Sequence, residues 1–232
     1  MKELADWKPR PRPARVTLDG RYCRLEPLDP LRHGDALFAA SMAPGAEERF
    51  RYLFNAPQSR EGFNEWMAHA VRADDPLIFA VVDTASGRCE GRQTLMRITP
   101  EHGVIEIGNI LWGPAIARTR VATEALYLFA VYVFETLGYR RFEWKCDARN
   151  EPSRCAALRF GFSFEGLFRR HMVIKGENRD TAWFAMADDD WPGIRAAFEQ
   201  WLAPGNFNEN GRQKERLATF RARRAATLFR EG

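Results

Sequence analysis

The sequence predicts one α+β domain in which helices pack on both faces of a mixed central sheet of about seven strands, an α/β/α arrangement. Three observations lead to this fold class. Short apolar runs separated by turn residues fill the middle of the chain, which predicts that the N-terminal part of the sheet is antiparallel. A long apolar stretch of helical period precedes an alternating segment, which predicts one parallel βαβ crossover. Two final runs flank Gly176 and predict a C-terminal hairpin.

The first seventy or so residues predict one strand and three helices. Three prolines lie among basic residues near the start, so residues 1–16 are expected to form an extended arm. A strand is expected at residues 22–28, and the Asp-Pro pair that follows would end it. The period then becomes helical. The expected helices span residues 31–42, 46–54 and 59–72.

The middle of the chain predicts the sheet and its crossover. Strands are expected at residues 77–83, 91–98 and 104–112. Five apolar residues then share one face of a helix expected at residues 122–137: Ala122, Leu126, Phe129, Val133 and Leu137. Gly138 is placed to cap that helix at its C-terminus. Residues 141–146 alternate between apolar and charged side chains, which is the period of a strand.

The last third predicts a short helix, the hairpin and a basic tail. Asn150 is the expected N-cap of the short helix, and Gly161 would end it. The hairpin strands are expected at residues 162–174 and 180–187, followed by a helix at residues 194–202. Seven Lys and Arg residues lie between positions 212 and 232, against only Glu215 and Glu231 in the same stretch. Such a tail suits either an anionic partner or the solvated face of a terminal helix.

Composition and cysteine usage exclude several classes of protein. No apolar run approaches the roughly 20 residues that span a bilayer, so no membrane partner is expected. The N-terminus lacks the pattern of a signal peptide, and a cytoplasmic location follows as the default. The four cysteines are scattered, which predicts reduced thiols rather than disulfides. No Cys/His cluster has ligand spacing, so no metal site is expected.

Several local motifs resemble one known family. The strongest motif reads NEPSRCAA from Asn150, followed by FGF at 160–162 and EG at 165–166. It resembles the N-x-x-S…A…GF…EG signature of the GNAT N-acetyltransferase superfamily, in the branch of ribosomal-protein N-terminal acetyltransferases (RimJ/RimL-like). The ATEA run from Ala122 matches the start of that branch's cofactor-facing helix, and Trp112-Gly113-Pro114 lies where the family's fourth strand leaves the sheet. The resemblance covers about residues 22–191.

The resemblance implies a GNAT fold and an enzyme of the EC 2.3.1 type. Such an enzyme is expected to move an acetyl group from acetyl-CoA, its cosubstrate, to a primary amine by direct attack in a ternary complex. The acceptor would be a protein N-terminus or a small-molecule amine. The cofactor-binding residues that the resemblance implies are Leu111, Trp112, Gly113, Arg118, Thr119, Arg120, Val121, Ala122, Thr123, Asn150 and Ser153.

The phosphate loop departs from the family pattern. The family usually reads R/Q-x-x-G-x-G/A at the turn into the helix, whereas residues 117–122 read ARTRVA, with Arg118 and Arg120 where glycines are common. A helix N-terminus still offers N–H groups and a positive dipole to phosphates. Arginine forks also bind phosphate, so we hypothesise that side chains replace part of the backbone cradle. The alternative is that both arginines are solvated and the cofactor site is degraded.

Three residues are expected to take part in catalysis. Many GNAT members place a tyrosine beside the thioester sulfur; here the resemblance places Ser153 there, as the acid for the leaving thiol. Asn150 would position the cofactor amide, and the alternative for both residues is helix capping. Glu106 would be the base, acting through water, if its strand face is the cleft, and inert if that face is solvent. Backbone N–H groups near Leu111 and Gly113 would polarise the thioester carbonyl.

The substrate and partners stay more open. Residues expected at the acceptor pocket are Phe50, Phe54, Trp66 and Arg179. The expected organisation is an arm at 1–16, an acetyltransferase domain at 17–203 and a basic helical tail at 204–232. The alternative function is a catalytically degenerate domain that binds CoA or a protein or RNA partner without turnover. Nucleic acid is otherwise not expected as a partner, and a homodimer is left open.

Overall fold

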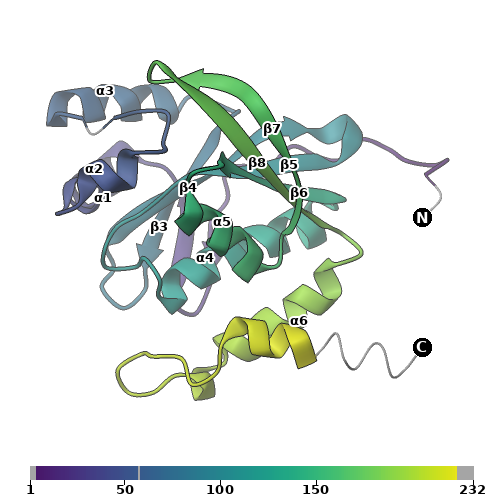
Figure 1. The fold of residues 1–232 in the computed structure, drawn as a ribbon. Helices are drawn as coiled ribbons and strands as arrows, with labels where there is room; N and C mark the ends of the chain where they lie inside the picture. The colour runs from purple at the N-terminus through teal and green to yellow at the C-terminus, as the bar shows by residue number, and fades with distance from the viewer. Residues whose placement is uncertain (1–3, 57, 224–232) are drawn as a thin grey trace.

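An eight-stranded mixed sheet forms the centre of the chain in the computed structural model, which describes residues 4–56 and 58–223 (Figure 1). The strand order is β1-β2-β3-β4-β5-β6-β8-β7. The strands are β1 (Leu18–Asp19), β2 (Cys23–Pro27), β3 (Leu77–Asp83), β4 (Cys89–Thr99), β5 (Val104–Trp112), β6 (Arg141–Asp147), β7 (Ser163–Ile174) and β8 (Glu177–Ala187). β1 is the strand in addition to the seven that the sequence predicts. It pairs through only two residues, which is too short for its sequence to show the period of a strand.

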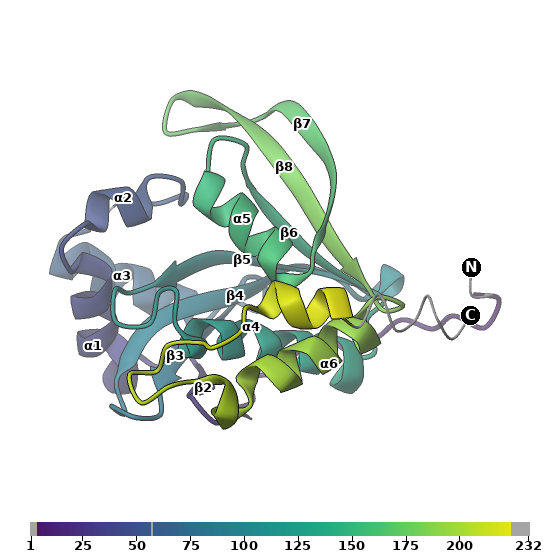
Figure 2. The ribbon, with the colours of Figure 1, turned by 60° about the horizontal axis from the view of Figure 1, so that its bottom comes forward.

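Helices cover both faces of this sheet, as Figure 2 shows. They are α1 (Pro30–Met42), α2 (Ala46–Phe50), α3 (Arg60–Ala70), α4 (Arg120–Val131), α5 (Glu151–Phe160) and α6 (Trp191–Leu202), with short turns η1 (Pro100–His102), η2 (Tyr132–Thr136) and η3 (Pro204–Asn206). A smaller apolar core joins α1 and α3 to one face of β3, and the main core joins the opposite face of the sheet to α4, α5 and α6. This α/β/α layering confirms the predicted fold class. No helix within the described residues is long and apolar enough to cross a membrane.

Several predicted helices differ from the observed ones in their bounds; among them, the helix predicted at 194–202 begins at Trp191, and the one predicted at 59–72 ends at Ala70. The helix predicted at 46–54 stops at Phe50, where Lys175 Nζ donates to the Phe50 carbonyl oxygen (2.8 Å). The long helix begins at Arg120 rather than 122, and its last turn widens into the π-helical η2. There the Leu137 N–H donates to the carbonyl oxygen of Tyr132, five residues earlier (2.9 Å). Tyr132, Val133 and Phe134 of this wider turn are buried.

The parallel strands β5 and β6 pair over only part of their length. Their register runs from Val104 opposite Arg141 to Ile107 opposite Trp144 and then stops. Asn109 has φ = 48°, and the pairing of β5 with β4 is irregular at this point, so β5 turns away from β6. The buried Arg92 guanidinium donates to the Asn109 carbonyl oxygen (2.7 Å) and so holds the bend. A gap therefore opens between the last residues of β5 and β6.

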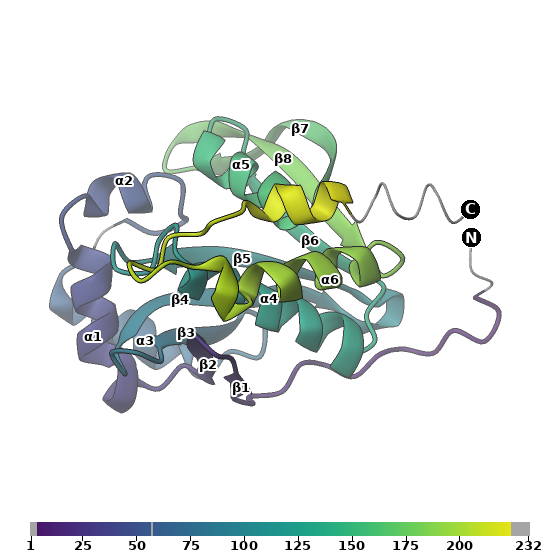
Figure 3. The same cartoon turned by 90° about the horizontal axis from the view of Figure 1, so that it is seen from below.

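Both terminal segments lie against the domain. In the N-terminal arm, Trp7 Nε1 donates to the carbonyl oxygen of Glu101 (2.7 Å), and the Ala14 N–H donates to Tyr132 Oη (2.8 Å). Residues 204–223, here called the C-terminal segment, fold back beside α6 and α5 (Figure 3). Arg221 Nη1 secures this segment by donating to the Leu158 carbonyl oxygen at the end of α5 (2.7 Å). The rest of the predicted tail, 224–232, lies outside the described residues.

Candidate active site

A cavity of about 1090 Å³ passes through the gap between β5 and β6. Successive side chains of β6 point to opposite faces of the sheet, so the cavity has one side on each face. The Trp144 ring packs against Phe160 of α5, whereas Lys145 Nζ lies 3.9 Å from the centre of the Trp183 ring of β8. We call these the α5 side and the hairpin side. Because residues of both sides line one cavity, two ligands that enter from opposite faces of the sheet can meet in the gap.

The N-terminus of α4 lies on the α5 side. Thr119 Oγ1 caps this helix by accepting from the Val121 N–H (3.1 Å), and intrahelical bonding begins where the Thr123 N–H donates to the Thr119 carbonyl oxygen. The first turn therefore leaves the N–H groups of Arg120 and Ala122 outside the helix's own hydrogen bonds. Arg118 has φ = 64°, a left-handed conformation that glycine adopts without strain. The loop thus keeps a glycine-like backbone without the glycine.

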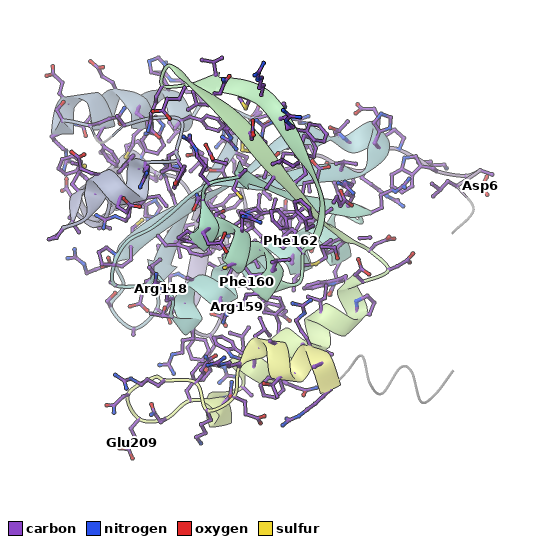
Figure 4. All side chains as sticks on the ribbon, viewed as in Figure 1. Asp6, Arg118, Arg159, Phe160, Phe162 and Glu209 are labelled. Carbon is purple, nitrogen blue, oxygen red and sulfur yellow. The ribbon has the colours of Figure 1, made fainter. Side chains whose placement is uncertain are left out.

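Four arginines line this end of the cavity: Arg118, Arg120, Arg159 and Arg212. The Arg120 guanidinium lies over the rings of Tyr22 (4.4 Å) and Phe207 (5.3 Å), so it joins the body of the domain to the C-terminal segment. Arg159 Nη1 donates to Thr123 Oγ1 (3.1 Å), and burial lowers the pKa of the Arg159 guanidinium. Figure 4 labels Arg118 and Arg159 between the sheet and the C-terminal segment. The described carboxylates of the cavity belong instead to α2 and to the hairpin side, which leaves this end electropositive.

The first turn of α5 places a hydroxyl at the middle of the cavity. Asn150 Oδ1 accepts from the Ser153 N–H (3.2 Å) and caps the helix. Ser153 Oγ accepts from Trp144 Nε1 (3.0 Å), and this contact was not foreseen from the sequence. Burial raises the pKa of the neighbouring Cys146 thiol, and a hydrogen bond with Ser153 acts in the opposite direction. Ser153 is therefore held by groups from two elements, and its residue lines the cavity.

Glu106 lies on the hairpin side and faces the cavity, with only 2% of the residue exposed. One carboxylate oxygen accepts from Arg97 Nη1 (2.7 Å), and Lys145 Nζ lies 2.8 Å from the other. Lys145 Nζ also lies 2.6 Å from Glu143 Oε2. The Glu106 carboxyl group is therefore held between two cationic side chains, at the point where the strands separate.

The structure brings most of the predicted site residues to this one cavity. Those that line it are Glu106, Trp112, Arg118, Thr119, Arg120, Ala122, Thr123, Asn150 and Ser153. Leu111, Gly113 and Val121 do not line it. The expectation of a free Gly113 N–H is wrong, because that group donates to the Glu90 carbonyl oxygen within the sheet (2.8 Å). The Val121 N–H is likewise occupied, by the cap.

The acceptor residues divide in a similar way. Phe54 and Arg179 line the cavity, whereas Phe50 is buried away from it and Trp66 packs in the core beneath Arg92. Sequence reasoning missed Asn109, Lys145 and Arg159 as lining residues. Of these three, only Lys145 could have been found from the sequence, because it alternates with Trp144 along β6 and so lies on the opposite face of the sheet. Two buried polar atoms in the wall, Trp112 Nε1 and Asn109 Oδ1, have no hydrogen-bond partner among the described residues.

A sheet whose parallel strands separate around a cavity, with an electropositive helix N-terminus on one side, defines a class of enzymes that bring a phosphate-bearing donor to an acceptor through the sheet. Residues 24–163, more than half of the chain, match the family model described as acetyltransferase (GNAT) domain. The chain belongs to the GNAT acetyltransferase family, and it is therefore an acyltransferase of the EC 2.3.1 type.

Solved structures agree with this assignment. A GCN5-related N-acetyltransferase from Brucella melitensis is 57% identical, with a TM-score of 0.92 over 94% of this chain and 99% of that one. A probable GNAT acetyltransferase from Chromobacterium violaceum is 39% identical, with a TM-score of 0.76 over 83% and 96% of the two chains. The RimL ribosomal L7/L12 α-N-protein acetyltransferase, solved with coenzyme A, is 18% identical, with a TM-score of 0.64 over 75% and 99%, and shows a shared fold alone. A comparison with curated proteins finds no match.

Proposed function

We propose that this chain is an active N-acetyltransferase that moves an acetyl group from acetyl-CoA to a primary amine in a ternary complex. One observation carries the proposal: a single cavity joins an electropositive helix N-terminus on the α5 side to a buried carboxylate on the hairpin side. The first end suits a donor that carries phosphates. The second end suits a cationic amine. The narrow part between them, where β5 and β6 separate, is where the two would react.

The residues on the α5 side fit acetyl-CoA. The N–H groups of Arg120 and Ala122, with the Arg118 and Arg159 side chains, would bind its phosphates. Two orphaned polar atoms support the fit further along, because Trp112 Nε1 can donate to a carbonyl and Asn109 Oδ1 can accept from an amide N–H. At about 1090 Å³ the cavity is at the upper end of the range for small-molecule sites, as an extended ligand requires.

When bound, acetyl-CoA supplies a thioester whose carbonyl carbon the amine nitrogen attacks. A C–N bond forms, the C–S bond breaks, and the amine loses one proton while the sulfur gains one. Ser153 is positioned to deliver a proton to the sulfur, because Trp144 Nε1 donates to its Oγ and orients a hydroxyl that lines the cavity. Glu106 attracts the protonated amine and takes its proton through a water molecule. Both oxygens of Glu106 already contact cations, which argues against direct transfer from the amine.

The degenerate alternative rested on arginines in place of glycines. The left-handed Arg118 argues against it, because the backbone cradle has the shape that glycine would give it. Membership of the RimJ/RimL-like branch stays a prediction. The acceptor is taken here as a small amine or a protein N-terminus.

Release of free thiol from acetyl-CoA, followed across a panel of small amines and peptides, tests the proposal. Thiol release that depends on an acceptor, together with an acetylated product of matching mass, is the expected result. Calorimetric binding of acetyl-CoA in the same preparation is the control. Tight binding with no acceptor-dependent thiol release would favour the degenerate alternative.

A further inference from the structure

The charged groups on the hairpin side of the cavity are nearly all satisfied by protein partners. Glu106 is held by Arg97 and Lys145, and Lys145 also contacts Glu143. Arg49 donates through its Nη atoms to three carbonyl oxygens at and after the end of α1, those of Ser41, Ala43 and Pro44. Arg49 Nε is buried without a partner, but its two Nη atoms are bonded to backbone carbonyl oxygens, so the charge of each of these cations already has partners in the protein.

Arg179 of β8 is the exception among the described residues that line this side. The residue is only 7% exposed, it lines the cavity, and its side chain takes part in no hydrogen bond or ion pair found among the described residues. Its Nε is buried without a partner, and its nearest recorded ring contact is Phe54, at 5.3 Å. Asp147 is the acid that interacts most strongly with its charge, but Arg149 already binds both oxygens of that carboxylate. A buried, unpaired guanidinium that faces a cavity indicates an anionic ligand.

The rim of this side favours a small ligand. Lys175, at the tip of the β7–β8 hairpin, donates to the Phe50 carbonyl oxygen of α2 (2.8 Å), and Tyr52 Oη donates to the Arg149 carbonyl oxygen (3.2 Å). These contacts bridge the hairpin, the segment after α2 and the turn after β6. The bridges leave less room for the N-terminus of a folded protein than for a free metabolite.

We propose that the acetyl acceptor is a small amine that also carries a carboxylate, and that Arg179 binds this carboxylate while the amine lies toward Glu106. The inference rests on the proposed acetyltransferase function and narrows its substrate class. The planar guanidinium matches a carboxylate with two parallel hydrogen bonds. Glu106 and Arg179 face the same side of the sheet and interact through their charges, so one zwitterionic amino acid can place its carboxylate on Arg179 and its amine near Glu106.

The test compares wild type with Arg179→Gln and Arg179→Lys on α-, β- and γ-amino acids, each paired with its carboxamide. Wild type is expected to show a kcat/KM at least tenfold higher for one or more acids than for the matching amides. Arg179→Gln is expected to bring this ratio close to one, and Arg179→Lys to leave it intermediate, with acetyl-CoA affinity unchanged within twofold. Equal loss on acid and amide, or no preference in wild type, would overturn the proposal.

A binding measurement separates this inference from the proposed function. N-acetyl amino acids and their N-acetyl amides are titrated into the CoA-saturated protein by calorimetry, which needs no turnover. Stronger binding of the acids, lost in Arg179→Gln, supports the carboxylate site even if no acceptor is acetylated. Equal binding of acids and amides refutes it even if acetylation occurs. Arg179→Gln is also expected to unfold at the same or a higher temperature, because the free protein then buries no unpaired charge.

Discussion

Trp144 Nε1 donates to Ser153 Oγ across 3.0 Å, joining the end of β6 to the first turn of α5. The bond fixes the hydroxyl beside the cavity that opens where β5 and β6 separate. Ser153→Ala is expected to lower kcat about tenfold, which is less than general acid catalysis usually contributes, because a thiolate is a good leaving group. The KM for acetyl-CoA is expected to change less than threefold, as steady-state kinetics would show.

Trp144→Phe is the matched control for that variant. It removes the same hydrogen bond but keeps the Ser153 hydroxyl, so most of kcat is expected to survive. Each variant loses about 1 kcal/mol of unfolding free energy, because one buried polar group loses its partner. Equal losses of kcat in both variants would mean that Ser153 acts only as a structural contact.

Arg118 combines a strained backbone with a charge at the phosphate end of the cavity. Its φ of 64° favours glycine, so Arg118→Gly is expected to raise the unfolding free energy by about 1 kcal/mol. Loss of the guanidinium is expected to weaken acetyl-CoA binding roughly tenfold. Arg118→Ala loses the same charge without relieving strain, and it should bind as weakly as the glycine variant without the gain in stability. Chemical denaturation and calorimetry measure the two effects separately.

The periodic parts of this fold could be predicted from the sequence, and the contacts between elements could not. The predicted ranges 77–83 and 104–112 match β3 and β5 residue for residue, because apolar strands between turn residues have a clear period. The contact of Ser153 with Trp144 depends on how α5 packs against β6, which no local pattern encodes. The contact of Arg159 with the first turn of α4 could not be predicted either, because the position of Arg159 within its own helix does not show which element lies beside it.

The phosphate loop was predictable in place but not in shape. With arginines where glycines are common, the sequence suggested either that side chains replace part of the backbone cradle or that the cofactor site is degraded. The strand before the loop and the capped helix after it determine the path of the chain, and Arg118 adopts the glycine-like conformation despite its cost. The bend of β5 at Asn109 was missed for a similar reason: it is held by Arg92, which comes from the neighbouring strand.

The C-terminal segment brings Arg212 to the cavity from outside the region that matches the family model. Arg212→Ala is expected to raise the dissociation constant of acetyl-CoA by roughly tenfold, because a phosphate would lose one charge-assisted hydrogen bond. Arg216→Ala is the matched control: it removes the same charge from the same segment at an exposed position that does not line the cavity. Calorimetry should show its binding unchanged within twofold. If both variants bind acetyl-CoA like wild type, the C-terminal segment lines the cavity without contributing to cofactor binding.

Asp147, at the end of β6, gives the fold a stability that depends on pH. Burial by itself would raise the pKa of its carboxyl, but the Arg149 side chain and N–H donate to both oxygens and lower the pKa below its ordinary value. A lowered folded-state pKa means that the ionised carboxylate stabilises the fold above the ordinary value. This contribution disappears as the pH falls through the folded-state pKa. Asp147→Asn is therefore expected to lose about 1–3 kcal/mol of unfolding free energy at pH 7.

The difference between Asp147→Asn and wild type should shrink steadily as the pH falls below about 4, where the wild-type carboxyl begins to take up its proton. Urea denaturation at several pH values between 3 and 7 measures it. Asp74→Asn is the control, because Asp74 forms only an exposed pair with Arg15, at 3.5 Å. Its effect is expected to stay below about 1 kcal/mol at every pH. A loss for Asp147→Asn that is as large at pH 3 as at pH 7 would show that its role is packing rather than charge.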